Sequence, residues 1–226
     1  DFDELERLLD ALEQPQIQNM SRFLLRAYID DNEAQALEDR SLILQNQEQL
    51  HALTTKFDLE NSPIIKADAQ NVVDTSRGTT IEQSGAKVYT VEHALAALVG
   101  LGIDNVMMEL DGPEIPILDG SSKLFIELLE NAGIEEQNAE KNYFELNETI
   151  TYKNEKSGTE FIAIPSDTYR LSVMVDYNSE TLGTQYAEIN NIDEFKKEIS
   201  GSKTFAFLHE LEYLHKNGLI KGGDLN

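Results

Sequence analysis

The stretch YTVEHALAALVGLGIDN, residues 89–105, decides how the middle of this chain folds. Alanine, leucine and valine dominate the positions after His93, which predicts a helix with an apolar inner face. Thr90 is a residue type that caps helix N-termini, so Glu92 and His93 are expected in the first helical turn. The following NVMMELDGPEIPI, residues 105–117, indicates a short strand punctuated by glycine and proline.

Similar elements extend in both directions from this stretch. SPIIKADAQNVVDT (residues 62–75) predicts short strands, and SKLFIELLENAGI (residues 122–134) predicts an amphipathic helix. A charged connector, EEQNAEKN, separates them from a second set of elements. That set has three strands with the alternation of half-buried antiparallel sheets and two helices, predicted at 142–154, 158–166, 169–178, 191–200 and 205–218.

The predicted fold class is therefore α+β, in two small units of residues 57–137 and 142–226. Each unit is expected to have a mostly antiparallel sheet with its helices on one face. The two helix layers are expected to pack together, because that arrangement buries both apolar helix faces.

Residues 1–56 differ in composition and pattern from the rest of the chain. They are acidic and rich in glutamine, with apolar residues at helical spacing. This pattern predicts an all-helical segment, a hairpin or dimerisation appendage that carries no chemistry. With no strands from this segment, the first sheet is expected to be short and to have an unpaired edge. We expect the N-terminal helices to cover that edge or to mediate self-association.

Composition excludes several classes of function. The chain has 226 residues, 18 of them basic and 42 acidic, and its net charge of -24 repels nucleic acid and anionic lipid surfaces. It contains no cysteine, which excludes disulfides, thiolate metal sites and cysteine nucleophiles. No apolar run is long enough to cross a bilayer, and the acidic start is unlike a signal peptide. We expect a soluble, cytoplasmic protein.

The adjacent Glu92 and His93 have two interpretations. They could be a capping acid beside an incidental surface histidine, or half of a metal-hydrolase site. The positive end of the helix dipole favours an ionised carboxylate and a neutral imidazole. A neutral imidazole binds metals and an ionised carboxylate can accept a proton from water, but this pair offers one metal ligand only.

Three longer segments of the sequence resemble a known protein family. TVEHALAALVGLGIDNVMMELDGPEIPILDGSS, residues 90–122, resembles the central motif of the zinc-dependent UDP-3-O-acyl-N-acetylglucosamine deacetylases of lipid A synthesis. SPIIKADAQNVVDTSRGTTI, residues 62–81, resembles the segment that precedes this motif. GSKTFAFLHELEYLHKNGLIKGGDLN, residues 201–226, resembles the segment that borders the acyl-chain passage. Together the similarity covers about residues 57–226.

The resemblance implies a role for each matching residue. His93 would be a zinc ligand, Glu92 the general base that activates the zinc-bound water, and Thr204 the hydroxyl that steadies the oxyanion. Phe205 and Phe207 would be apolar walls near the acyl chain. The implied reaction removes the N-acetyl group from a UDP-linked acylated glucosamine.

The implied zinc site is incomplete within this sequence. The family takes two further zinc ligands from a downstream His-x-x-x-Asp pair and an acid partner from another histidine, so we expect those ligands beyond Asn226. His209 and His215 are six apart on one predicted helix, point to nearly opposite sides, and are interpreted as partly exposed polar positions. The 226-residue chain alone is therefore expected to be inactive. The alternative is a non-catalytic relative that acts as a binding or assembly module.

A diphosphate substrate needs basic groups, which are scarce here. The basic residues nearest the matched motifs are Arg77, Lys203 and Lys221. Because Lys203 adjoins Thr204, we expect its side chain to bind substrate from the same cleft as His93.

Overall fold

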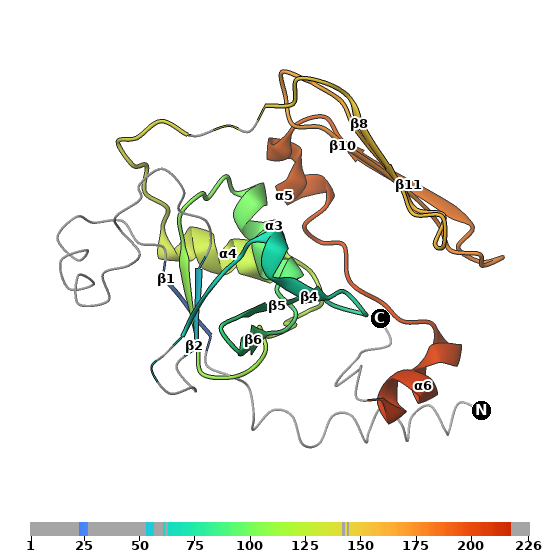
Figure 1. Cartoon of the computed structure of the whole chain (residues 1–226), viewed down its shortest axis with the longest axis horizontal. Coiled ribbons are helices and arrows are strands. Elements are labelled where there is room, and N and C mark those ends of the chain that lie inside the picture. Colours follow the sequence, from blue (N-terminus) through green and yellow to red (C-terminus); the bar gives the residue numbers. More distant parts are fainter. Residues whose placement is uncertain are drawn as a thin grey trace.

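The computed structural model of the chain describes residues 23–26, 53–56, 61, 63–141, 143 and 145–217 (Figure 1). Its strands are β1 (Phe23–Arg26), β2 (Leu53–Lys56), β3 (Ile64–Lys66), β4 (Val72–Asp74), β5 (Thr80–Gln83), β6 (Ala86–Val88), β7 (Met107–Leu110), β8 (Ile150–Lys153), β9 (Glu160–Ala163), β10 (Leu171–Asp176) and β11 (Thr184–Ile189). Its helices are α3 (Glu92–Gly100), α4 (Lys123–Ala132), α5 (Phe195–Glu198) and α6 (Leu211–Lys216), with 3-10 turns η3 (Ala69–Asn71), η4 (Ile192–Glu194) and η5 (Leu208–Glu210).

The described strands form four small sheets. One has the order β1-β7-β2-β3, in which only the β2–β7 pair is parallel. A second has the order β4-β5-β6, and β8–β9 and β10–β11 are separate two-stranded ribbons, all antiparallel. The protein is thus a mixed α+β fold with small, mainly antiparallel sheets and few helices, as the alternation patterns predict.

The apolar core lies where α3 and α4 pack on the first two sheets. Phe125, Ile126 and Leu129 of α4 are almost fully buried there, and they recur at the three- and four-residue spacing of one helix face. Ala97 and Leu98 provide the corresponding face of α3. The residues predicted to form the inner faces of these two helices therefore build the main core.

The N-terminal prediction is wrong at two described places. Phe23–Arg26 and Leu53–Lys56 are strands that flank β7, not parts of helices, so this segment does contribute strands to the first sheet. The four-residue stretches FLLR and LTTK are too short for periodicity to separate a strand from a helix, and pairing with the backbone of β7 decides between them. The predicted self-association concerns residues that lie mostly outside the described part.

The ribbons of the second half are more exposed than their alternation predicts. Every residue of β8, β9 and β10 is exposed, including Phe161 at 65% and Met174 at 73%. In Figure 1 these ribbons lie at one side of the molecule, beyond α5. Antiparallel pairing is confirmed, but the prediction that one face of each strand is buried is wrong for the described residues, because no second layer of them covers either ribbon.

The short helix α5 connects the second half to the core. Phe195, its first residue, packs partly buried against the core and contacts the end of α3 at Gly100. A Cβ built on Gly100 would lie only 2.1 Å from Cδ1 of the Phe195 ring. Glycine is therefore required at this position for the ring to reach α3.

No helix in the described part of the chain is long and apolar enough to span a membrane.

The Gly100–Phe195 contact yields a stability prediction. Gly100→Ala forces the Phe195 ring away from α3, and such overpacking should lower the free energy of unfolding by about 1–3 kcal/mol in urea denaturation. Gly201→Ala is the matched control, because its Cβ would meet no atom within 4 Å. Equal stability of the two variants would contradict the proposed role of this contact.

Candidate functional site

The entry into α3 is a strained turn. Thr90 has a φ of 60°, an unusual left-handed conformation for a β-branched residue, and its hydroxyl donates a 2.7 Å hydrogen bond to Oε1 of Glu114. The predicted N-cap role of Thr90 is wrong: the helix begins one residue later, after Val91, and has no side-chain cap. The hydroxyl is committed to Glu114, and the left-handed backbone differs from the extended conformation that a capping residue adopts.

Backbone hydrogen bonds fix this turn on both sides. Tyr89 N–H donates to Pro113 O (3.0 Å), and Ile115 N–H donates to Tyr89 O (3.1 Å). After the strained residue, Val91 N–H donates to Thr79 O at 3.2 Å. The start of α3 is thereby held between the 113–115 segment and the loop that leads into β5.

Glu92 faces that same loop. Its Oε2 accepts a 2.8 Å hydrogen bond from Thr79 N–H, and its side chain is 36% exposed. Its Oε1 lies close to Gly78, where an added Cβ would be 3.5 Å away. One carboxylate oxygen is thus anchored by the protein backbone, while the side chain as a whole stays accessible to a water molecule.

His93 lies beside Glu92 and is more buried. Its side chain is 14% exposed, and Nε2 is 3.8 Å from Oε1 of Glu92, too far for a hydrogen bond. This places an imidazole and a carboxylate next to each other without consuming either in a mutual hydrogen bond. Among the described residues there is no group of three or more His, Cys, Asp or Glu that could hold a metal ion.

Thr204 is fixed by the loop before α4. Its N–H donates a 2.8 Å hydrogen bond to Gly120 O, and Ser122 N–H donates to Ser200 O at 3.1 Å. Gly120 has a φ of 78°, and a Cβ there would come within 3.3 Å of Cγ2 of Thr204. The close approach and the left-handed backbone together explain why glycine precedes the two serines.

Lys203 lies within electrostatic reach of Asp119. Burial raises the pKa of Asp119, but hydrogen bonds from the hydroxyl and the N–H of Ser121, together with the charge of Lys203, outweigh it and lower that pKa below its usual value. Asp119 is therefore ionised at neutral pH. The prediction that Lys203 shares a cleft with His93 remains a prediction.

Phe205 and Phe207 belong to a row of neighbouring rings, in which Phe205 and Phe207 meet edge to face and Phe207 and His209 are stacked. Ring centroids are 5.5 Å apart for Tyr177–Phe205 and for Phe205–Phe207, and 5.4 Å apart for Phe207–His209. Phe205 is half exposed. The two predicted wall residues are thus brought together, and Tyr177 and His209 extend the same aromatic surface, which the sequence analysis had not linked to them.

Among the other basic and imidazole candidates, Arg77 and His215 lie within the described residues. Arg77 forms an ion pair with Glu210, and its Nη2 lies 2.6 Å from Oε1 of that residue. His215 is exposed near the end of α6. Lys221 lies outside the described residues.

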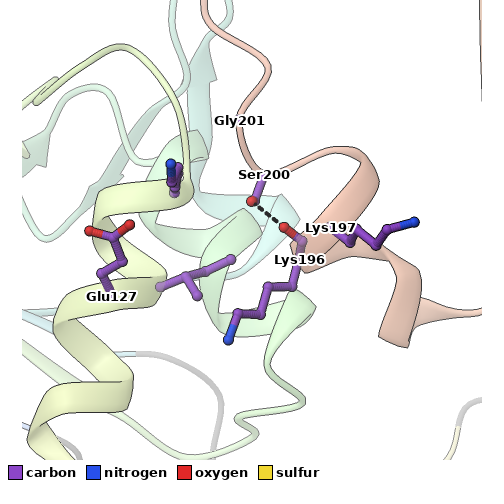
Figure 2. Close-up of a pocket in the computed structure, with 7 residues that line it drawn as sticks. Glu127, Lys196, Lys197, Ser200 and Gly201 are labelled. Atoms are coloured by element: carbon purple, nitrogen blue, oxygen red, sulfur yellow. Dashed lines mark hydrogen bonds between the residues drawn. The ribbon is translucent and has the colours of Figure 1, made fainter.

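A pocket of about 250 Å³ between α4 and α5 is not part of this arrangement (Figure 2). Lys123, Lys196 and Lys197 line it with Glu127, Ser200 and Gly201. Figure 2 shows the side chains of Lys196 and Lys197 pointing in different directions. Each is paired outside the lining, Lys196 with Glu130 and Lys197 with Glu198, so their charges do not converge on the pocket.

The chain has relatives among known proteins. Residues 42–226 match the sequence profile described as LpxC, UDP-3-O-acyl N-acetylglycosamine deacetylase. The chain belongs to this family. The match contains the Thr90–His93 turn, the Gly120 loop and the Thr204–Phe207 segment, and LpxC proteins are zinc-dependent.

Individual LpxC relatives show similar identity levels. The chain is 43% identical over 171 residues to the bifunctional enzyme LpxC/FabZ of Bacteroides thetaiotaomicron, covering 76% of the chain and 37% of that protein. It is 38% and 40% identical to the UDP-3-O-acyl-N-acetylglucosamine deacetylases of Saccharophagus degradans and Haemophilus influenzae, covering 76% of the chain and 57% of each relative. The alignments thus span only about a third to three fifths of these relatives.

Sequence reasoning missed two supporting residues of this candidate site. Glu114 lies within the segment PEIPI, residues 113–117, but its distance along the sequence from Thr90 gives no sign that the two side chains interact. Gly120 could have been noticed, since a glycine in DGSS between two periodic segments indicates a turn. Its contact with Thr204 depends on the tertiary fold and has no local sequence signal.

The Thr90–Glu114 hydrogen bond can be tested directly. Thr90→Val preserves the shape of the side chain but removes the hydroxyl, so we expect a loss of about 1–2 kcal/mol of unfolding free energy. Thr90→Ser keeps the hydroxyl and should recover most of that loss. Urea denaturation of both variants checks the prediction, which equal stabilities of Thr90→Val and Thr90→Ser would contradict.

Proposed function

We propose that this protein takes part in lipid A biosynthesis as a deacetylase that hydrolyses the N-acetyl group of a UDP-3-O-acyl-N-acetylglucosamine. The observation that carries the proposal is the pairing of Glu92 with His93 at the start of α3. One oxygen of Glu92 is anchored by Thr79 N–H, and the imidazole of His93 is adjacent but not hydrogen-bonded to it. Membership of the LpxC family supports this activity.

The chain's own residues would divide the work of amide hydrolysis. Glu92 would accept a proton from the attacking water, since its carboxylate is partly exposed and held in one orientation. Thr204 would donate its hydroxyl proton towards the carbonyl oxygen as negative charge develops there. The bond from Thr204 N–H to Gly120 O supports this role because it fixes the residue's backbone.

Substrate binding would use the aromatic row and one lysine. Phe205 and Phe207 present ring surface of the kind that an acyl chain buries. Lys203 would compensate the diphosphate charge in a protein that is otherwise strongly acidic. We assign Arg77 no such role, because its guanidinium is engaged by Glu210.

The metal-binding side chains in the described part can supply one ligand of a zinc site. His93 can contribute one imidazole ligand, and no other donors of the described residues join it to make a group of three. When bound, zinc would supply Lewis-acid chemistry at the amide carbonyl. In the family's pattern the remaining ligands would come from a downstream His-x-x-x-Asp pair.

We further propose that the two α+β units of residues 57–137 and 142–226 pack through their helices. The contact of Phe195 with the end of α3 supports this arrangement, because it joins α5 of the second unit to α3 of the first. As in the family, we place the protein in the cytoplasm.

The proposed function is tested by acetate release from UDP-3-O-acyl-N-acetylglucosamine. The 226-residue chain extended by the family's downstream segment should be active, and Glu92→Gln should lower kcat about 100- to 10,000-fold without loss of zinc. Glu82→Gln is a matched control, since Glu82 pairs only with Lys87 at the surface in the described part. A zinc-loaded, folded but inactive extended protein would instead support the binding-module alternative.

Metal content gives a second prediction. With His93 as its single recognised ligand, the 226-residue chain alone should retain well under one zinc per chain after dialysis, because one imidazole binds weakly. The extended chain should retain one zinc and lose it on His93→Ala. Stoichiometric zinc in the unextended chain would show that further ligands exist within it.

A further inference from the structure

The loop between β4 and β5 forms hydrogen bonds with both Glu92 and Glu210. At its end, Thr79 N–H donates to Oε2 of Glu92 at 2.8 Å. Two residues earlier, Nη2 of Arg77 donates a 2.6 Å hydrogen bond to Oε1 of Glu210, just beyond the Thr204–Phe207 segment. We propose that Arg77 and Glu210 are a positioning pair. The pair fixes the aromatic row, formed by Tyr177, Phe205, Phe207 and His209, relative to Glu92.

Arg77 is presented from a hydrogen-bonded loop. Its backbone has a φ of 80°, a left-handed conformation that few non-glycine residues adopt. The loop is anchored at its start by the bond from Ser76 N–H to Oδ1 of Asp74 (3.0 Å), and at its end by the bond from Val91 N–H to Thr79 O. The guanidinium therefore projects from a backbone whose direction is fixed on both sides.

Glu210 uses its two carboxylate oxygens for different partners. Oε1 accepts from Arg77, and Oε2 accepts from Phe207 N–H at 3.1 Å. Glu210 N–H in turn donates to Phe207 O at 2.9 Å, so the two residues close a turn reciprocally, much as a capping box does. The Arg77 hydrogen bond, followed by the Phe207 bond, lowers the pKa of Glu210.

This pair belongs to one of the two hydrogen-bonded attachments that the described residues give the Thr204–Phe207 segment. Thr204 is bound to Gly120 O, while Phe207 is bound through Glu210 to Arg77. The first attachment fixes the hydroxyl residue independently of the second. Loss of the Arg77–Glu210 pair should therefore release the ring of Phe207, and with it the edge-to-face contact with Phe205, more than it moves Thr204.

The strength of the pair follows from its exposure. The side chains of Arg77 and Glu210 are 39% and 29% exposed, so water and salt screen their attraction. We expect an effect of the size seen for exposed ion pairs, about three-fold in a local opening equilibrium. That is too small to unfold the protein, and it suits a residue pair that positions a segment.

Limited proteolysis of the 226-residue chain tests the pair without reference to activity. Glu210→Gln and Arg77→Gln should each speed chymotrypsin cleavage after Phe205 and Phe207 about three-fold at low salt. Arg77→Lys keeps a positively charged donor for Oε1 of Glu210 and leaves the Phe207 N–H bond to Oε2 intact, so it should retain slow cleavage. One molar NaCl should accelerate cleavage of the wild type but hardly that of Glu210→Gln.

Lys153→Gln is the matched control. It breaks an exposed ion pair with Glu160, at 3.2 Å, in the β8–β9 ribbon, and should leave cleavage after Phe205 and Phe207 unchanged. Unchanged cleavage there in both Arg77→Gln and Glu210→Gln would overturn the proposal. So would an equal acceleration after Tyr152 and Phe161, because that would indicate general unfolding.

The pKa of Glu210 provides an independent readout by carbon NMR titration of its carboxyl group. It should lie below the usual glutamate value in the wild type and in Lys153→Gln, and rise on Arg77→Gln. Because the folded-state pKa is lowered, the pair is intact above the unfolded-state pKa and is lost as pH falls through the folded value. An ordinary pKa in the wild type would contradict the proposal.

The catalytic consequence rests on the proposed function. In an active extended chain, Arg77→Gln should raise KM about three-fold with little change in kcat, because Thr204 and Glu92 keep their own anchors. A fall in kcat at constant KM would overturn this assignment. If the extended wild type is inactive, the proposed function fails, while cleavage rates and the Glu210 titration still decide the positioning pair.

Discussion

The turn into α3 is the constraint on which the candidate site depends. Thr90 is held in a left-handed conformation by its bond to Glu114, and the residues on either side are bound to the 113–115 segment and to Thr79 O. Strain of this kind persists only where surrounding contacts over-determine the backbone. Here those contacts aim the first helical turn, so Glu92 meets the Thr79 N–H and His93 lies beside it.

Long, strongly patterned segments could be predicted from the sequence. The apolar spacing of α4 and the Val106–Leu110 run identified a helix and a strand correctly, and both contribute to the main core. The β5–β6 hairpin was overlooked, although Ser84-Gly85 has the left-handed pair of φ angles that two-residue hairpin turns need. A Ser-Gly dipeptide there was a usable signal.

Other features had no local signal. Phe23–Arg26 is a strand because β7 offers a pairing edge, and a stretch of three apolar residues and an arginine cannot by itself distinguish that outcome from a helix. Glu92 and His93 were recognised through the motif around them, yet the supports supplied by Glu114, Gly120 and Glu210 come from distant segments. The exposure of the β10 strand likewise depends on what covers it, which alternation within the strand does not encode.

The Arg77–Glu210 pair joins residues 133 positions apart, and this separation bears on the order of folding. Closing so long a loop costs more chain entropy than the local contacts of α3 and α4 with the early strands. The first core can therefore collapse before the Thr204–Phe207 segment docks. The aromatic row then forms late in folding. During synthesis its formation must wait until the η5 turn has left the ribosome.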